Sequence, residues 1–118
     1  MSYQPHKSTV TDITLVKFLR GDLEYNLETI PGIGPKAKER FAENGIHNSF
    51  QLLAKFLSMK QTDGDDCVAH CTQFYNWLGE IKLNTNRHSI TKSVAEKLSI
   101  SFPNLYQESQ FDEMVTEC

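Results

Sequence analysis

The stretch TIPGIGPKAKERF, residues 29–41, restricts the fold more than any other part of the chain. Two glycines and two prolines share the five positions 31–35, and most side chains could not enter such a turn. Pro35 suits the first position of a helix, because the N–H that proline lacks would have no partner there. The basic side chains Lys36, Lys38 and Arg40 follow directly. The sequence therefore predicts a tight turn that leads into a basic helix over residues 35–44.

Apolar residues recur at helical spacing along most of the chain, and no alternating stretch is long enough for a paired strand. We therefore expect an all-α protein, a compact five-helix bundle. Besides the basic helix, we expect a first helix that is capped at Ser8 or Thr9 and ends at about Arg20. A third helix over 50–59 should be capped at Asn48 or Ser49. The fourth should cover 66–82, and the fifth should run from Arg87 to Leu98 after a turn at 84–86. The expected buried residues are Ile13, Val16 and Leu19 in the first helix, Val68, Cys71, Phe74 or Tyr75, Leu78 and Ile81 in the fourth, with Trp77 beside them, and Ile90, Val94 and Leu98 in the fifth.

The third of these helices, FQLLAKFLSM, carries apolar residues on two sides and so needs more than one neighbour. Phe50, Leu53, Ala54 and Leu57 form one stripe, and Leu52, Phe56 and Met59 form the other. A small domain has few helices to cover both stripes, and an uncovered stripe usually marks an interface. We therefore expect a symmetric homodimer joined through this helix. The alternative is that the fourth helix and the apolar residues Phe111, Met114 and Val115 cover the second stripe within one chain.

Charge is distributed unevenly along the 118 residues, although the net charge is only −3. Residues 1–60 carry eight Lys/Arg and six Asp/Glu, whereas residues 61–118 carry four and nine. We expect a helical domain over residues 1–100 and an acidic extension over 101–118. No apolar run is long enough to span a membrane, and the three cysteines, with no glycosylation sequon, argue against a secreted disulfide scaffold. An intracellular protein with reduced thiols is the expectation.

The turn has the pattern apolar-Pro-Gly-apolar-Gly, which is typical of a helix-hairpin-helix motif. Ile30 and Ile33 would enter the core, while Gly32 and Gly34 leave backbone N–H groups bare at the positive end of the next helix. Such groups can receive a phosphate oxygen, and Lys36 and Arg40 can contact the same backbone. Phosphate contacts read no base, so binding would not depend on sequence. The alternative is that the turn is only a connector between helices.

Residues 29–59, TIPGIGPKAKERFAENGIHNSFQLLAKFLSM, resemble the barrier-to-autointegration factor family without a gap, and FYNWL at 74–78 resembles that family's next helix. The resemblance covers roughly residues 4–100. It implies a sterile-alpha-motif-like (SAM-like) helical fold and a homodimer that binds and bridges double-stranded DNA without sequence preference. It also implies that the protein is not an enzyme and that it acts on chromatin in the nucleus, or at sites of viral DNA for a virus-encoded protein. LEM-domain proteins are the partners that the resemblance suggests.

The family's functional positions fall on particular residues of this chain. The expected DNA contacts are Lys7, Gly32, Ile33, Gly34, Lys36, Arg40, Asn86, Arg87, His88 and Lys92, of which those at 86–88 are assigned loosely because a gap precedes them. The expected dimer contacts are Leu52, Leu53, Ala54, Phe56 and Met59, with the small Ala54 at the centre. Each basic side chain taken singly could also be a solvated surface charge. Pro35, the longer loop at 61–71 and the acidic extension depart from the family's pattern.

Other chemistry is weakly indicated. Cys67, His70 and Cys71 lie on one expected helix, but no second Cys/His pair completes a metal site, so we interpret them as core residues. The acidic run DGDD at 63–66 lacks the later glutamate of a calcium loop. No metal, cofactor or catalytic group is expected. The competing functions are a SAM-like protein–protein interaction module and an accessory DNA-binding module of a repair or replication assembly.

Overall fold

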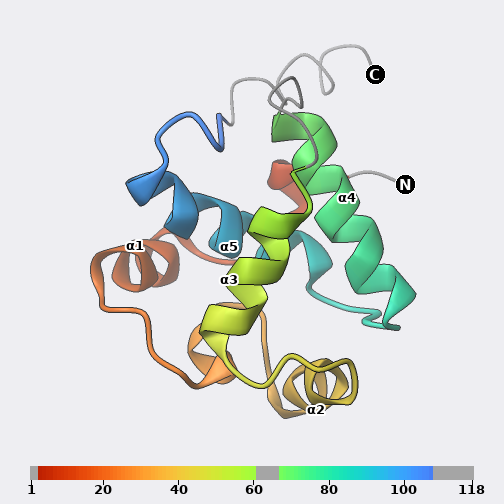
Figure 1. Ribbon diagram of the computed structural model, residues 1–118. Helices are drawn as coiled ribbons and strands as arrows, with labels where there is room; N and C mark the ends of the chain where they lie inside the picture. Colours follow the sequence, from red (N-terminus) through yellow and green to blue (C-terminus); the bar gives the residue numbers. More distant parts are fainter. Residues whose placement is uncertain (1–2, 61–66, 108–118) are drawn as a thin grey trace.

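The computed structural model describes residues 3–60 and 67–107 (Figure 1). Along the chain the elements are η1 (Pro5–Lys7), α1 (Asp12–Arg20), η2 (Leu27–Thr29), α2 (Pro35–Glu43), α3 (Ser49–Ser58), α4 (Cys67–Glu80) and α5 (Arg87–Ser101), where η marks a short 3-10 helix. The described ranges contain five α-helices and no strand. The predicted all-α fold with five helices is confirmed. The acidic run at 63–66 and the apolar residues at 111, 114 and 115 lie outside the described residues.

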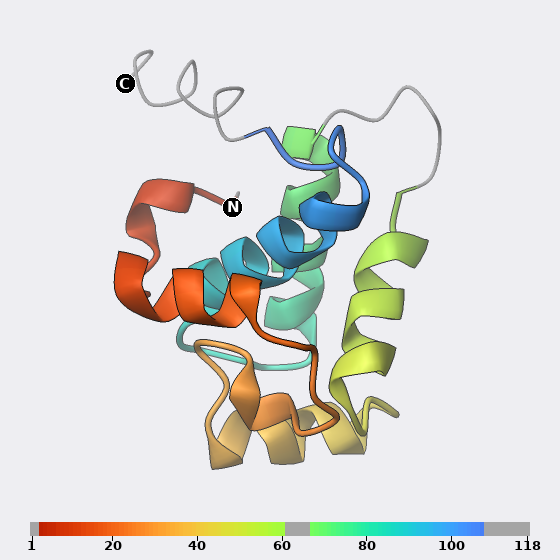
Figure 2. The same ribbon diagram turned by 90° about the vertical axis from the view of Figure 1, so that its left-hand side faces the viewer.

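Helix α5 is the centre of the bundle. It contacts α1, α3, α4 and η1, and in both views it runs through the middle of the molecule (Figures 1 and 2). Its sequence suits that place because its buried residues, which include Ile90, Val94 and Leu98 as predicted, lie on several sides of the helix. Helix α2 lies at the opposite end of the molecule from the last described residues.

Aromatic rings join α2, α3 and α4. Phe56 packs against Phe74 with ring centroids 5.0 Å apart, and Trp77 packs against Phe74 at 5.7 Å and Phe41 at 6.1 Å. His70 is fully buried, stacks on Phe56 at 4.2 Å, and its Nε2 lies 2.6 Å from the Phe56 carbonyl oxygen. These contacts fix α3 against α4 and bring α2 to the same core.

The second stripe of α3 is covered within the chain. Leu52 and Phe56 are fully buried, and Met59 is half-buried against the core. Leu53 of the first stripe is buried as well. The inference that the second stripe stays open was wrong, because α4 packs on it. Leu52, Leu53 and Phe56 therefore face the core of their own chain, while Met59 stays partly exposed. The exposed side of α3 carries Ala54 instead, together with Phe50, which is 48% exposed.

Helix α1 begins later and faces differently than predicted. Thr11, rather than Ser8 or Thr9, caps it, and the Thr11 side chain accepts a hydrogen bond from Thr14 N at 3.2 Å. Leu15 is the buried residue, whereas Ile13 is 78% exposed and Val16 is also exposed. The apolar residues of α1 lie on two overlapping sides of the helix. The side that carries Leu15, Phe18 and Leu19 packs on α5, and the side that carries Ile13 and Val16 faces solvent.

The folded part extends past residue 100. Leu105 and Tyr106 are buried, and the Tyr106 hydroxyl lies 2.9 Å from that of Tyr3. The thiol of Cys67 donates to the Gln107 carbonyl oxygen at 3.3 Å and accepts from the Gln107 N–H at 3.4 Å. The boundary expected at 100/101 therefore falls short of the last core residues.

Candidate nucleic-acid interface

The turn before α2 has the geometry of a buried apolar plug with exposed backbone. Ile30 and Ile33 are buried, and Ile33 N–H donates to the Ile30 carbonyl at 3.1 Å. Gly32 has φ +99°, a conformation that side chains rarely adopt. Gly34 has φ −103° and ψ −172°, an extended conformation open to any residue, and it is the N-cap of α2. Glycine is therefore required by backbone geometry at position 32 but not at position 34.

The start of α2 presents unused hydrogen-bond donors. Gly34 has no side chain to cap the helix, and Pro35 follows it. Lys38 N–H donates to the Gly34 carbonyl at 3.0 Å, but in the described part of the chain no group accepts from the N–H of Gly34, Lys36 or Ala37. These three groups lie at the N-terminal end of α2, which is the positive end of the helix dipole. The N–H groups of Gly34, Lys36 and Ala37 could thus donate hydrogen bonds to an anionic oxygen, and we call them the phosphate seat.

The turn is held against the beginning of α5. A side chain at Gly32 would bring its Cβ within 3.0 Å of Ile90 Cγ1 and 3.3 Å of Ser89 Cβ. Asn86 Nδ2 donates to the Gly32 carbonyl at 3.3 Å. Asn86 occupies the left-handed region with φ 61° at the N-cap of α5, and its side chain does not cap that helix. Asn86, predicted as a DNA contact, thus uses its amide to fix the turn.

The basic side chains of α2 lie at the surface. Lys36 is exposed, and no ion pair involves it within the described ranges. Arg40 Nη1 lies 3.3 Å from Glu43 Oε1, and Lys38 Nζ lies 3.5 Å from Glu28 Oε2. Exposed pairs of this kind contribute only about 0–1 kcal/mol. A phosphate can therefore replace the carboxylate at Arg40 with little loss of stability.

Arg87 lies across α4 rather than toward the turn. Its guanidinium carbon is 4.5 Å from the centroid of the Tyr75 ring. A Cβ on Gly79 would overlap Arg87, so Gly79 leaves the space that this side chain fills. The guanidinium is only partly buried, and its charge stays near the start of α5.

His88 anchors the N-terminal segment to α5. Its Nδ1 accepts a hydrogen bond from Gln4 N–H at 3.2 Å, and its ring lies 4.5 Å from that of Tyr75. Burial lowers the pKa of His88, and the charges of Lys7, Arg87 and His6 lower it further. The neutral ring has a structural role. The charge of Lys7 acts on His88, so Lys7 lies near the start of α5, while Lys92 lies half-buried about a turn further along.

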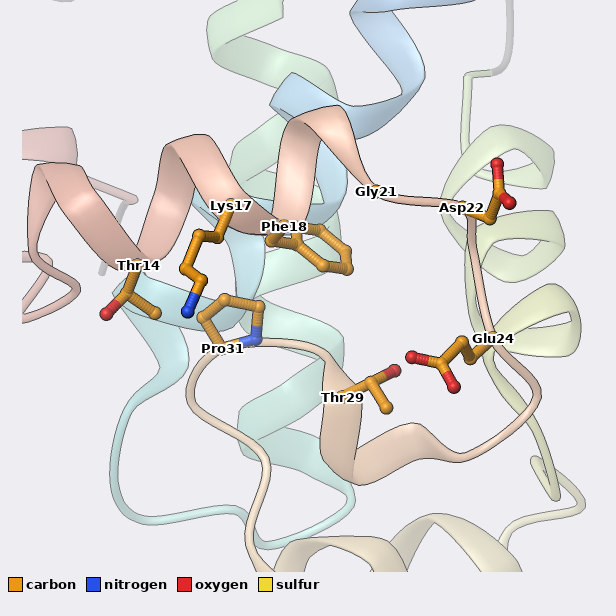
Figure 3. A pocket seen from close by; sticks show the side chains of 8 residues that line it. All are labelled: Thr14, Lys17, Phe18, Gly21, Asp22, Glu24, Thr29 and Pro31. Carbon is orange, nitrogen blue, oxygen red and sulfur yellow. The ribbon is translucent and has the colours of Figure 1, made fainter.

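Two residues were not singled out from the sequence, Lys17 beside the turn and His6 beside His88. Lys17 of α1 extends toward Pro31, as Figure 3 shows, and His6 lies near His88. No spacing in the sequence indicates Lys17, because α1 and the turn meet only in the folded chain.

The described residues contain no group of three His, Cys, Asp or Glu side chains placed to hold a metal ion. Cys67 and Cys71 are buried free thiols, and burial followed by the charge of Cys67 raises the pKa of Cys71. No helix among the described residues is both long and apolar enough to cross a membrane.

The family model described as barrier to autointegration factor matches residues 16–96, which is more than half of the 118-residue chain. The matched range includes the turn, helices α2, α3 and α4, and α5 as far as residue 96. Comparisons with curated proteins and with solved structures give no significant match. The resemblance inferred from the residues is confirmed, and the chain belongs to the barrier-to-autointegration factor family, which is a family of DNA-binding proteins.

Proposed function

We propose that this protein binds double-stranded DNA without sequence preference and seats a phosphate at the start of α2. The observation that carries the proposal is the set of three N–H groups, of Gly34, Lys36 and Ala37, that no group of the described chain accepts. The exposed side chains of Lys36 and Arg40 flank that seat. Backbone N–H groups and lysines that contact phosphates read no base edge. The binding is therefore general for duplex DNA.

The footprint extends beyond the turn. The Asn86 bond to Gly32 holds the start of α5 beside the turn, and Lys7 and Arg87 lie near that start. Lys17 borders the turn on its other side. Four to six phosphates neutralised per chain give an expected slope of log affinity against log salt of about −4 to −5.

A titration of two short duplexes of unrelated sequence, followed by fluorescence anisotropy over a salt series, tests the proposal. We expect nearly equal affinities for the two duplexes and the steep salt dependence given above. Arg40→Ala should weaken binding by roughly 1–2 kcal/mol, the scale of one charge-assisted contact. A strong preference for one sequence, or an affinity independent of salt, would refute the proposal.

We further propose that two copies join through the exposed side of α3 and so bridge two duplexes. Tyr25 is 71% exposed and meets the half-exposed Phe50 edge to face, with ring centroids 5.2 Å apart. Ala54 follows Phe50 by one helical turn and is also exposed. An exposed aromatic pair beside a small residue suits close approach of two helices. A two-fold axis there would leave each copy its own DNA site.

Light scattering measures whether the protein is a dimer, and Ala54→Glu tests where the contact lies. The variant should be monomeric, bind DNA weakly and fail to aggregate two labelled duplexes. Asn76→Glu places the same charge on the exposed side of α4 and should dimerise normally. A monomeric parent, or an Ala54→Glu protein that still bridges, contradicts the proposed contact.

We propose nuclear chromatin as the place of action, or sites of viral DNA if the chain is virus-encoded. LEM-domain proteins stay a predicted partner. The support for both is membership of the family.

A further inference from the structure

A cleft separates the C-terminal half of α1 from the segment that leads into the turn (Figure 3). Its volume is about 370 Å³, within the size range of small-ligand sites. The lining residues are Thr14, Lys17, Phe18, Gly21, Asp22, Glu24, Thr29 and Pro31. This α1 cleft shares only its Pro31 wall with the turn, and neither the phosphate seat nor the exposed side of α3 lines it.

The floor of the α1 cleft is rigid and apolar. Phe18 is half-buried and packs on the core, and Pro31 lies near it in Figure 3. The backbone under Phe18 is held by Lys97, whose ammonium donates to the carbonyl oxygens of Phe18 at 2.8 Å, Leu19 at 3.2 Å and Gly21 at 2.5 Å. A ligand would thus meet a preformed surface and would not have to order it.

The walls of the α1 cleft carry charges of both signs. Glu24 directs its carboxylate toward Thr29, whereas Lys17 lies beside Pro31 (Figure 3). Lys38 pairs with Glu28 and Arg40 with Glu43, and within the described residues no ion pair involves Glu24 or Lys17. Asp22 acts on Lys97, where its charge opposes the fall in pKa that burial causes. Glu24 is therefore the free carboxylate of the cleft.

We propose that the α1 cleft binds an arginine side chain from a segment of a protein partner. The guanidinium would pair with Glu24 while its planar group and stem lie on Phe18 and Pro31. An aromatic face attracts cations and disfavours anions, and arginine combines a flat cation with an apolar stem. Among the lining side chains, Asp22 and Glu24 are negative and Lys17 is positive. The Lys97 ammonium also lies 5.2 Å from the Phe18 ring centroid, where its hydrogen bonds go to backbone carbonyl oxygens. This inference goes beyond DNA binding and does not depend on it.

The test uses a short peptide with one central arginine, and as control the same peptide with citrulline, which has nearly the same shape and no charge. Amide shifts of the full-length protein are followed by NMR without DNA. We expect the arginine peptide, with a Kd on the order of 1 mM, to shift the amides of residues 17–24 and Thr29. The citrulline peptide should shift them much less. Equal shifts from both peptides, or shifts spread over the acidic surface, would overturn the proposal.

Matched charge variants locate the effect. Glu24→Gln should weaken arginine-peptide binding by about 3- to 10-fold, and Lys17→Gln should strengthen it, because a like charge is removed. Glu39→Gln removes an exposed, unpaired carboxylate on α2, outside the cleft, and should bind as the parent does. Equal losses in Glu24→Gln and Glu39→Gln would show a general charge effect and refute the site. Because DNA is absent, failure of this test leaves the proposed DNA binding untouched.

Discussion

Replacing Gly34 with aspartate should raise the stability of the protein and remove its DNA binding. Gly34 is the N-cap of α2, and its φ and ψ of −103° and −172° are those that N-cap residues with side chains adopt. A Cβ there would meet no atom within 4 Å. The aspartate can therefore enter without strain and accept hydrogen bonds from Lys36 or Ala37 N–H, the donors proposed to hold a phosphate.

Both magnitudes follow from this geometry. An aspartate cap is more favourable than glycine by a few tenths of a kcal/mol, and its charge at the helix start adds about 0.3–1 kcal/mol. The phosphate would lose one or two charge-assisted hydrogen bonds of about 1.5–3 kcal/mol each and would face a carboxylate. The expected loss of affinity is thus about 100-fold or more.

Two measurements on the same set of variants check the reasoning. Urea unfolding can be followed through Trp77, the single tryptophan of the chain, and DNA affinity by anisotropy at one salt concentration. Gly34→Asn supplies a neutral cap, and Gly34→Ala supplies bulk without a cap. We expect stability to fall in the order Asp, Asn, Gly, Ala, and DNA affinity to be lowest for Asp. An aspartate variant that binds DNA like the parent, or that unfolds more easily, refutes the account of this turn.

Three further predictions concern single positions away from that cap. Gly32→Ala should destabilise the fold by roughly 1–3 kcal/mol, because residue 32 has a φ of +99° and the new Cβ would press on Ile90. A variant that unfolds at the same urea concentration as the parent would contradict this strain. Lys82→Gly should stabilise by about 0.5–1 kcal/mol, because Lys82 has φ 69° in the turn after α4; a lower thermal midpoint would contradict this. His88 has a folded pKa below 6.5, so the unfolded chain binds more protons and stability should fall as pH drops below that value. His88→Asn, which keeps an acceptor for Gln4 N–H, should flatten this pH dependence, whereas the exposed His47→Asn should not.

Local chemistry made the turn and the helix after it predictable. Pro35 begins α2 and Asn44 ends it, as the residues indicated, because proline and glycine restrict the backbone by themselves. The cap of α3 at Asn48 was also among the expected residues, and its side chain accepts a hydrogen bond from Gln51 N at 2.9 Å. Such features depend on residues within one turn of the chain.

Features that depend on distant residues could not be derived in this way. Which side of α1 is buried is decided by α5, and which side chains of α3 are covered is decided by α5 together with the α4 residues that pack on Phe56. The role of Asn86 depends on a bond to Gly32, which is 54 positions away in the sequence. The glycine pattern thus predicted the turn where we propose that a phosphate binds, while the bond from Asn86 that holds this turn became visible only in the folded chain.

The way the helices are capped also bears on the proposed DNA site. Thr11 and Asn48 cap α1 and α3 with their side chains, as stable helices require. The starts of α2 and α5 have no side-chain cap. Gly34 has no side chain, and the Asn86 amide donates to the Gly32 carbonyl oxygen instead of capping α5. These two uncapped starts are also the two that the Asn86–Gly32 bond holds together. Among the helix starts whose caps the structure describes, these two give up local stability side by side, and sites of function are where such local rules are expected to fail.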